Sequence, residues 1–136
     1  MRSTIITLLI ILSVKYCQGQ SNIMSDTIYL NLNDKLLIEA YLDSSNHISF
    51  KKVDVAMNVE KTMSIELKYG SDMGAMMVLK NPFPKKLHYK AELYSYKKKD
   101  YVETSVIPVH PNLVSYETWP YKIDKIRLTG FTLDAK

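Results

Sequence analysis

From residue 26 onward, apolar and polar residues alternate with a period of two through most of the chain. The clearest case is 63–69 (MSIELKY), and 87–94 (LHYKAELY) follows the same pattern. Successive side chains of a strand point to opposite faces, so this alternation is typical of half-buried strands. No segment shows a convincing helical period over ten residues. The sequence therefore predicts an all-β domain.

Turn signals divide this region into about eight strands. We expect them at 28–32, 36–42, 48–57, 63–69, 76–79, 87–94, 101–109 and 123–133. Short strands with a turn every eight to twelve residues favour a two-sheet antiparallel β-sandwich, with an immunoglobulin-like arrangement. A small closed barrel is the alternative.

Several local patterns make sharper predictions about how the strands connect. The first two strands resemble a hairpin that turns at residues 33–34. In the third strand, the apolar residues before and after 51–52 are out of phase. A β-bulge there would bring them back to one face. The continuous apolar run 76–79 suits a strand buried on both faces, and the last strand should be irregular near Gly130. Residues 112–120 are expected to form an irregular aromatic loop.

The first nineteen residues differ from the rest. Arg2 precedes an apolar run, 5–14, and the small residues Cys17 and Gly19 follow it. This order is typical of a secretory signal. The apolar run would span only about 15 Å as a helix, which disfavours a permanent membrane anchor. We therefore expect a signal peptide over 1–19, a flexible leader over 20–25 and a single β-sandwich domain over 26–136.

Two absences bear on where such a protein works. Cleavage after Gly19 would remove Cys17 and leave no cysteine, whereas small secreted eukaryotic domains usually rely on disulfides. The chain also lacks an Asn-x-Ser/Thr glycosylation acceptor. Both absences favour an exported bacterial protein, periplasmic or extracellular. Lipidation is disfavoured, because residues 15–16 before Cys17 depart from the small residues of a lipobox.

Net charge argues against nucleic acid as a partner. The whole chain has 18 basic and 14 acidic residues, a net charge of +4. Loss of Arg2 and Lys15 with the signal would leave 16 basic residues and a net charge of +2. So small a charge provides little attraction for a phosphate backbone.

The C-terminal half carries a resemblance. The stretches LKNPFPKKLHYKAELY and ETSVIPVHPNLVSYETWPYKIDKIRLTGF resemble small exported bacterial proteins, of Bacteroidetes type, that carry no assigned function. The resemblance covers residues 76–133. It implies a bacterial origin and a β fold, and it implies no catalytic or binding residue.

Aromatic and basic side chains provide the main functional signal. Tyrosine and tryptophan offer large flat surfaces with a polar group, which suit a sugar or a protein partner. The lysines of the 97–99 turn, flanked by tyrosines, would attract anionic groups. The predicted partner-binding surface consists of Tyr94, Tyr96, Lys97, Lys98, Lys99 and Trp119. The structural alternatives are a solvated turn that blocks edge pairing, and a pair of aromatic residues, Trp119 and Tyr116, that closes one open end of the sandwich.

Neither a catalytic site nor a cofactor or metal site is predicted. The three histidines, His47, His88 and His110, lack the spacing of metal ligands, and no Gly-x-Ser-x-Gly elbow is present. The favoured function is a non-enzymatic binding module of the cell envelope whose partner is a protein or a glycan.

Two alternatives to this function are kept. One is a carbohydrate-binding module that uses Trp119 and the neighbouring tyrosines. The other is a small hydrolase or a copper carrier, the latter using Met73, Met76 and Met77 as soft ligands together with His88 or His110.

Overall fold

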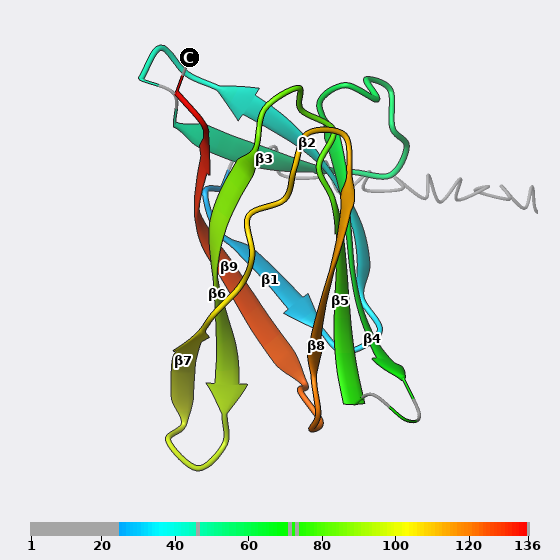
Figure 1. Ribbon diagram of the computed structural model, residues 1–136, viewed down its shortest axis with the longest axis vertical. Helices are drawn as coiled ribbons and strands as arrows, with labels where there is room; N and C mark the ends of the chain where they lie inside the picture. The colour runs from blue at the N-terminus through cyan, green and yellow to red at the C-terminus, as the bar shows by residue number, and fades with distance from the viewer. Residues whose placement is uncertain (1–24, 46, 71, 73, 136) are drawn as a thin grey trace, which may run out of the picture.

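The computed structural model describes residues 25–45, 47–70, 72 and 74–135 (Figure 1). These residues form nine strands and no helix, which confirms the predicted all-β class. The strands are β1 (Ile28–Asn31), β2 (Lys35–Leu42), β3 (Ile48–Val53), β4 (Thr62–Gly70), β5 (Gly74–Lys80), β6 (Leu87–Ser95), β7 (Asp100–Thr104), β8 (Val114–Trp119) and β9 (Lys125–Leu133).

The predicted signal peptide, 1–19, and leader residues 20–24 lie outside the described residues. Within the described part of the chain, no helix is long and apolar enough to cross a bilayer.

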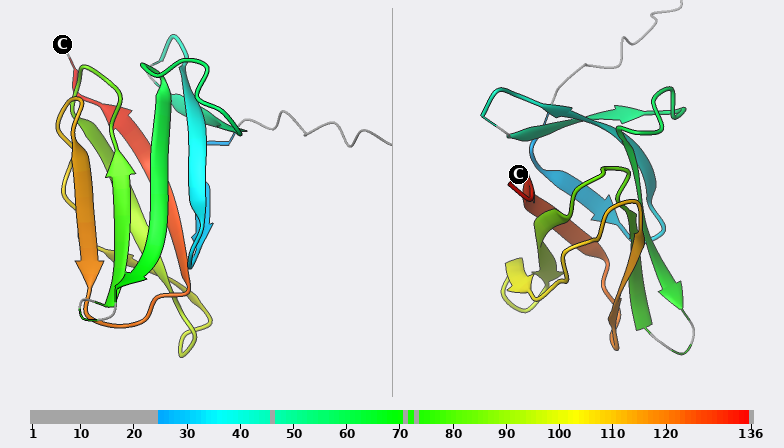
Figure 2. Two further views of the ribbon diagram at one scale, coloured as in Figure 1. Left: turned by 90° about the vertical axis from the view of Figure 1, so that its right-hand side faces the viewer. Right: turned by 45° about the horizontal axis from the view of Figure 1, so that its top comes forward.

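Two antiparallel sheets face each other (Figure 2). The four-stranded sheet has the order β1-β9-β6-β7, and the five-stranded sheet has the order β3-β2-β4-β5-β8. The strands are divided between two separate sheets, so the predicted sandwich is confirmed and the closed barrel is not formed. The strand number is nine rather than about eight.

The core lies between the sheets and follows directly from the alternation. On β4, Met63, Ile65 and Leu67 are fully buried, as are Ile126 and Leu128 on β9. Aromatic rings fill one part of the interior. The Phe131 ring lies 4.6 Å from the Phe50 ring and 5.9 Å from the Tyr89 ring, measured between centroids. These contacts join both sheets into one core.

The hairpin predicted for the first two strands is wrong. β1 pairs with β9, whereas β2 pairs with β3 and β4 in the other sheet. The turn at Asn33, which has φ of 72°, carries the chain from one sheet to the other. The Asp34 carboxylate stabilises the turn by accepting a 2.7 Å hydrogen bond from the Asn31 backbone N–H.

The bulge predicted at 51–52 is also wrong. β3 pairs with β2 without interruption from Ile48 to Val53. The out-of-phase residues Val55 and Met57 follow the strand and are 64% and 89% exposed, so they are not part of the core. The register irregularity lies between β6 and β9 instead, near Gly130, where the predicted irregularity is confirmed.

The C-terminal half contains two further differences from the predictions. Residues 112–120 were expected to form a loop, but β8 occupies most of this stretch and pairs with β5. The strand expected over 101–109 ends at Thr104, and residues 105–113 then cross from one sheet to the other.

The prediction that 76–79 forms a strand buried on both faces is wrong. On β5, Met77 and Leu79 are buried, whereas Met76 and Val78 are only partly buried on the opposite face.

Candidate functional site

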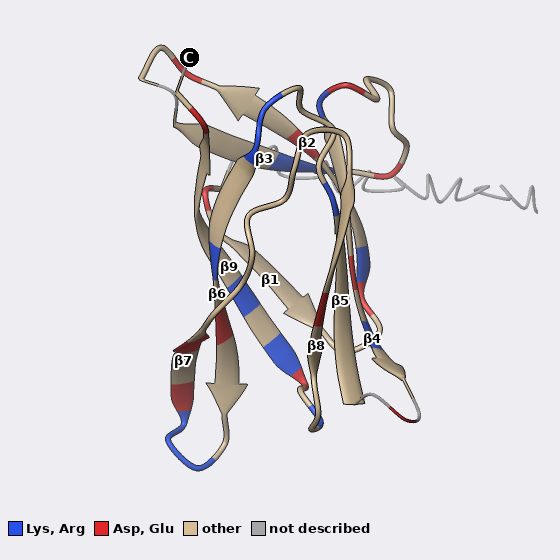
Figure 3. Ribbon diagram, in the orientation of Figure 1, with Lys and Arg blue, Asp and Glu red and all other residues tan. Residues whose placement is uncertain are grey.

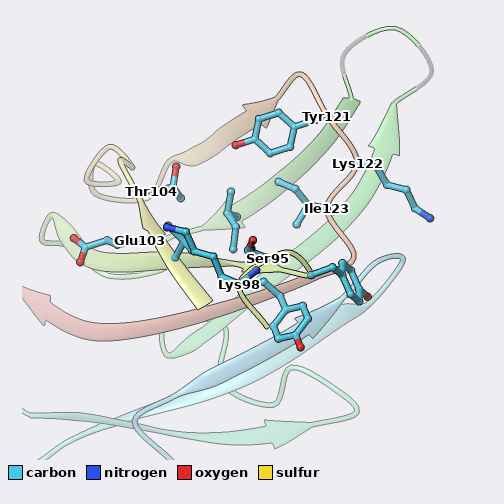
Figure 4. A pocket seen from close by; sticks show the side chains of 11 residues that line it. Ser95, Lys98, Glu103, Thr104, Tyr121, Lys122 and Ile123 are labelled. Atoms are coloured by element: carbon cyan, nitrogen blue, oxygen red, sulfur yellow. Dashed lines mark hydrogen bonds between the residues drawn. The ribbon is translucent and has the colours of Figure 1, made fainter. Parts of the chain in front are cut away.

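A pocket of about 450 Å³ opens where the β6–β7 hairpin meets the connection between β8 and β9 (Figure 4). Both segments lie at the lower end of the sandwich in Figure 1. We call it the hairpin pocket. Its volume falls within the range of small-ligand sites. Its lining residues are Leu93, Tyr94, Ser95, Tyr96, Lys98, Val102, Glu103, Thr104, Tyr121, Lys122 and Ile123.

The hairpin pocket has an apolar base and a polar rim. Leu93 and Ile123 are buried parts of the sandwich core, and Leu93 pairs with Val102 across the hairpin. In Figure 4, Tyr121 and Ile123 face the hairpin that carries Ser95 and Thr104, whereas Lys122 points away. The Lys122 ammonium instead pairs with Asp124 at 3.3 Å. The pocket thus offers apolar contact, hydroxyl groups and an exposed tyrosine.

Trp119 supports this pocket from the core, so its predicted surface position is wrong. Its side chain is only 6% exposed, and the indole N–H donates a 3.3 Å hydrogen bond to Thr104 Oγ1. Thr104 also lines the pocket. The burial of Trp119 agrees with the structural alternative in which it closes one end of the sandwich, whereas Tyr116, the other residue of that alternative, is 64% exposed.

Gly74 fixes the backbone that leads into the pocket wall. It has φ of 74°, and a Cβ atom there would lie 2.1 Å from the Trp119 carbonyl oxygen and 2.8 Å from the Tyr121 nitrogen. No side chain fits such a close approach. The start of β5 therefore positions residues 119–121, and with them Tyr121.

The outer side of the hairpin carries a cluster of tyrosines. Tyr94 makes edge contacts with Tyr96 and Tyr101, with ring centroids 5.0 and 5.3 Å apart. Tyr29 of β1 joins the cluster at 6.2 Å from Tyr101. We call these four residues the tyrosine face. Edge contacts of this kind hold aromatic rings in defined orientations.

Two cations from β9 stabilise the tyrosine face. The Lys125 ammonium lies 5.3 Å from the Tyr94 ring centroid, and the Arg127 guanidinium lies 4.5 Å from the Tyr101 ring centroid. Both distances suit cation–π attraction. Arg127 also donates two 2.7 Å hydrogen bonds to Glu92. These hydrogen bonds lower the pKa of Glu92, whereas burial raises the pKa of Tyr101.

The predicted surface residues divide into two groups. Tyr94, Tyr96 and Lys98 all line the hairpin pocket, and Lys97–Lys99 form the exposed turn beside it (Figure 3). Trp119 forms the second group alone, because it is buried in the core and does not line the pocket. The lysines are free to meet an anion, because none of the three is held in an ion pair with another described residue.

Sequence reasoning missed several residues of the site. The pairing of β6 with β7 brings Ser95 and Thr104 to the pocket, and the β8–β9 connection brings Ile123 there. No local sequence pattern indicates either arrangement. Tyr121 is one of the tyrosines next to Trp119, but it was not among the residues of the predicted surface. Arg127 and Glu92 are opposite charges on two strands, and only the register identifies them as a pair.

No metal site is visible in the part of the chain that the structure describes. No group of three histidine, cysteine, aspartate or glutamate side chains converges among those residues. Met76 and Met77 lie on opposite faces of β5, so they cannot bind one ion together as the copper alternative required. Met73, its third residue, lies outside the described residues. His88 is paired with Asp134 at 2.6 Å.

Comparison with protein-family models, with curated proteins and with solved structures gives no match.

Proposed function

We propose that this protein is a non-catalytic binding module that holds an acidic sugar unit of a glycan in the hairpin pocket. One observation carries the proposal: Tyr94, Tyr96 and Lys98 of the hairpin and Tyr121 of the β8–β9 connection line a single pocket of about 450 Å³. That volume suits one sugar ring with its substituents.

The pocket chemistry supports this ligand class. A sugar ring presents apolar C–H groups on its faces, which pack well against an exposed aromatic ring such as Tyr121. Ser95 offers a hydroxyl that both donates and accepts hydrogen bonds. Thr104 accepts the Trp119 N–H and keeps its own O–H as a donor. Lys98, with its neighbours in the turn, would attract a carboxylate.

A calorimetric titration tests the proposal. Oligosaccharides of uronic acids should bind, and neutral glucose oligosaccharides of the same length should bind at least tenfold more weakly. Lys98→Ala and Tyr121→Ala should each weaken binding by about tenfold, the effect of losing roughly 1.4 kcal/mol. Lys52→Ala and Tyr69→Ala are matched controls, because both side chains are exposed on the other sheet. Equal affinity for acidic and neutral sugars would contradict the proposal.

A protein partner is a second candidate, and the tyrosine face favours it. Four tyrosines are held together by ring contacts and by two cations on the outer side of the four-stranded sheet and its β6–β7 turn. Pre-oriented tyrosines and arginine are typical of contact surfaces between proteins. Tyr29→Ala together with Tyr101→Ala should abolish such binding and leave sugar binding unchanged, because neither residue lines the hairpin pocket.

We also propose that the protein is exported in a bacterium and acts in the periplasm or outside the cell. The order of charge, apolar run and small residues over 1–19 supports this location. Mass spectrometry of the protein from fractionated cells should find a mature N-terminus at Gln20. An intact Met1 in a cytoplasmic fraction would contradict the location.

A further inference from the structure

The described sandwich has four edge strands, and three of them are poorly suited to pairing with another chain. β1 has only four residues, and β7 has five with exposed carboxylates at Asp100 and Glu103. β3 carries two lysines, and Ser25 covers its middle through two backbone hydrogen bonds with Phe50. Short length, charge and coverage are the usual means of preventing association at a sheet edge.

β8 lacks these protections. It contains neither lysine, arginine nor proline, and its outward residues Val114, Tyr116 and Thr118 are all exposed. The Leu113 carbonyl accepts a hydrogen bond from Asn81 at the end of β5. The N–H and C=O of one residue point to the same side of a strand, and the side alternates from one residue to the next. Because the Leu113 carbonyl points to β5, the N–H and C=O groups of Val114, Tyr116 and Thr118 point to the free edge. Among the described residues, no hydrogen bond outside the regular ladders uses them.

The outer surface beside the middle of this edge carries no charge. Across the sheet, Tyr116 lies next to Val78, and Thr118 lies next to Met76. Tyr116 itself is 64% exposed. Lys80 is the one charged residue of β5 and lies opposite Val114 at the end of the strand, and further charges such as Glu66 lie on β4. Figure 2 shows β8 at the margin of the five-stranded sheet, where a further strand could be added.

We propose that two copies of this chain associate through β8, with the two strands antiparallel and Tyr116 opposite Tyr116 of the second copy. A two-fold axis at Tyr116 places Val114 opposite Thr118 of the second copy. All three outward residues are then paired, and their free N–H and C=O groups satisfy each other. The two five-stranded sheets become one continuous sheet.

Charge and side-chain contacts favour a second copy as the occupant. Glu117 is the one charged residue of β8. Its carboxylate is held within the chain by a 2.9 Å hydrogen bond from the Ile107 backbone N–H. In the proposed register it lies opposite Ser115 of the second copy, so no like charges meet. On the outer surface, Val78 and Tyr116 form an uninterrupted row of side chains with Tyr116 and Val78 of the second copy.

Sedimentation velocity of the full chain tests the association. The wild type should change from monomer to dimer between low micromolar and near-millimolar concentration. Tyr116→Lys should remain monomeric throughout, because two ammonium groups would meet at the axis. Tyr69→Lys is the matched control, since Tyr69 is similarly exposed on β4 but lies away from the edge. Circular dichroism should show both variants folded. A monomeric wild type, or a dimeric Tyr116→Lys variant, would overturn the proposal.

Cysteine cross-linking tests the register independently of the mass measurement. In a Cys17→Ser background, Tyr116→Cys should form a disulfide-linked dimer on mild oxidation. Directly opposed residues of a hydrogen-bonded pair have Cα atoms about 5.5 Å apart, which suits a disulfide. Val114→Cys alone should form no disulfide-linked dimer, and mixing it with Thr118→Cys should give cross-linked dimer. Efficient cross-linking of Val114→Cys with itself would overturn this register.

Discussion

Arg127 on β9 and Glu92 on β6 are directly paired across the four-stranded sheet, with two parallel 2.7 Å hydrogen bonds from the guanidinium to the carboxylate. The same guanidinium lies over the Tyr101 ring of β7. One arginine therefore links β9, β6 and β7 and orients the tyrosine face. Bidentate pairs of this kind are stronger than ordinary surface ion pairs because their geometry is fixed.

Acid should weaken the protein through this pair. Arg127 lowers the pKa of Glu92 below its ordinary value of 4.5, so the contribution to stability is fully present above that pH. It is lost as the pH falls through the lowered pKa. Denaturant unfolding monitored from neutral pH into the acid range should show this loss. Glu92→Gln should be less stable at neutral pH and less sensitive to acid. Glu60→Gln, at an exposed position in a turn, should behave like the wild type.

Truncation of Trp119 should destabilise the sandwich strongly. Trp119→Ala removes a buried indole and should lower the free energy of unfolding by about 3–5 kcal/mol. Thr104→Val removes only the hydrogen bond from the indole N–H and should lower it by about 1 kcal/mol. Chemical denaturation measures both values. A loss below about 1 kcal/mol for Trp119→Ala would contradict its position in the core.

Gly74 and Gly70 should respond very differently to the same substitution. Gly74→Ala places a Cβ atom against the backbone of residues 119–121, so it should lower stability by more than about 2 kcal/mol and weaken ligand binding at Tyr121. Gly70→Ala is the matched control, because its nearest neighbour would be 3.8 Å away. It should leave both properties nearly unchanged. Similar melting temperatures for the two variants would contradict the close approach at Gly74.

Tyr89→Phe should stabilise the protein. The Tyr89 hydroxyl is buried and makes no hydrogen bond of good geometry among the described residues, although the Ser115 hydroxyl lies near it, and burial raises the pKa of Tyr89. A buried hydroxyl without a partner costs free energy, so its removal should raise the free energy of unfolding by about 1 kcal/mol. Tyr41→Phe is a useful contrast, because the Tyr41 hydroxyl donates a hydrogen bond to Glu39. A destabilised Tyr89→Phe variant would show that the hydroxyl is hydrogen-bonded.

The sheet layers could be predicted from the sequence because burial on each strand follows the local alternation. β4 and β6 show this most clearly, with every second residue in the core. The predictions failed where the position of a strand depended on pairing with a strand distant in the sequence. β1 and β2 are separated by a short turn but belong to different sheets, since their partners are β9 and β4.

The candidate site was predicted only in part for the same reason. The tyrosines and lysines of the hairpin are neighbours in sequence, so the local pattern located them. Trp119 is buried because β8 pairs with β5 and brings it opposite Ala75, which is not visible from the residues around it. Tyr121 enters the pocket only because Gly74, far away in the sequence, admits the backbone of residues 119–121.

Nuclear magnetic resonance titration of the isotope-labelled protein with a uronic-acid oligosaccharide tests the proposed pocket most directly. The largest amide shifts should fall on residues 93–98, 102–104 and 121–123, which come together only in the hairpin pocket. The same titration of Tyr121→Ala should show much smaller shifts at the same residues. Shifts confined to the lysine turn, or largest on the other sheet, would contradict a binding pocket between the hairpin and the β8–β9 connection.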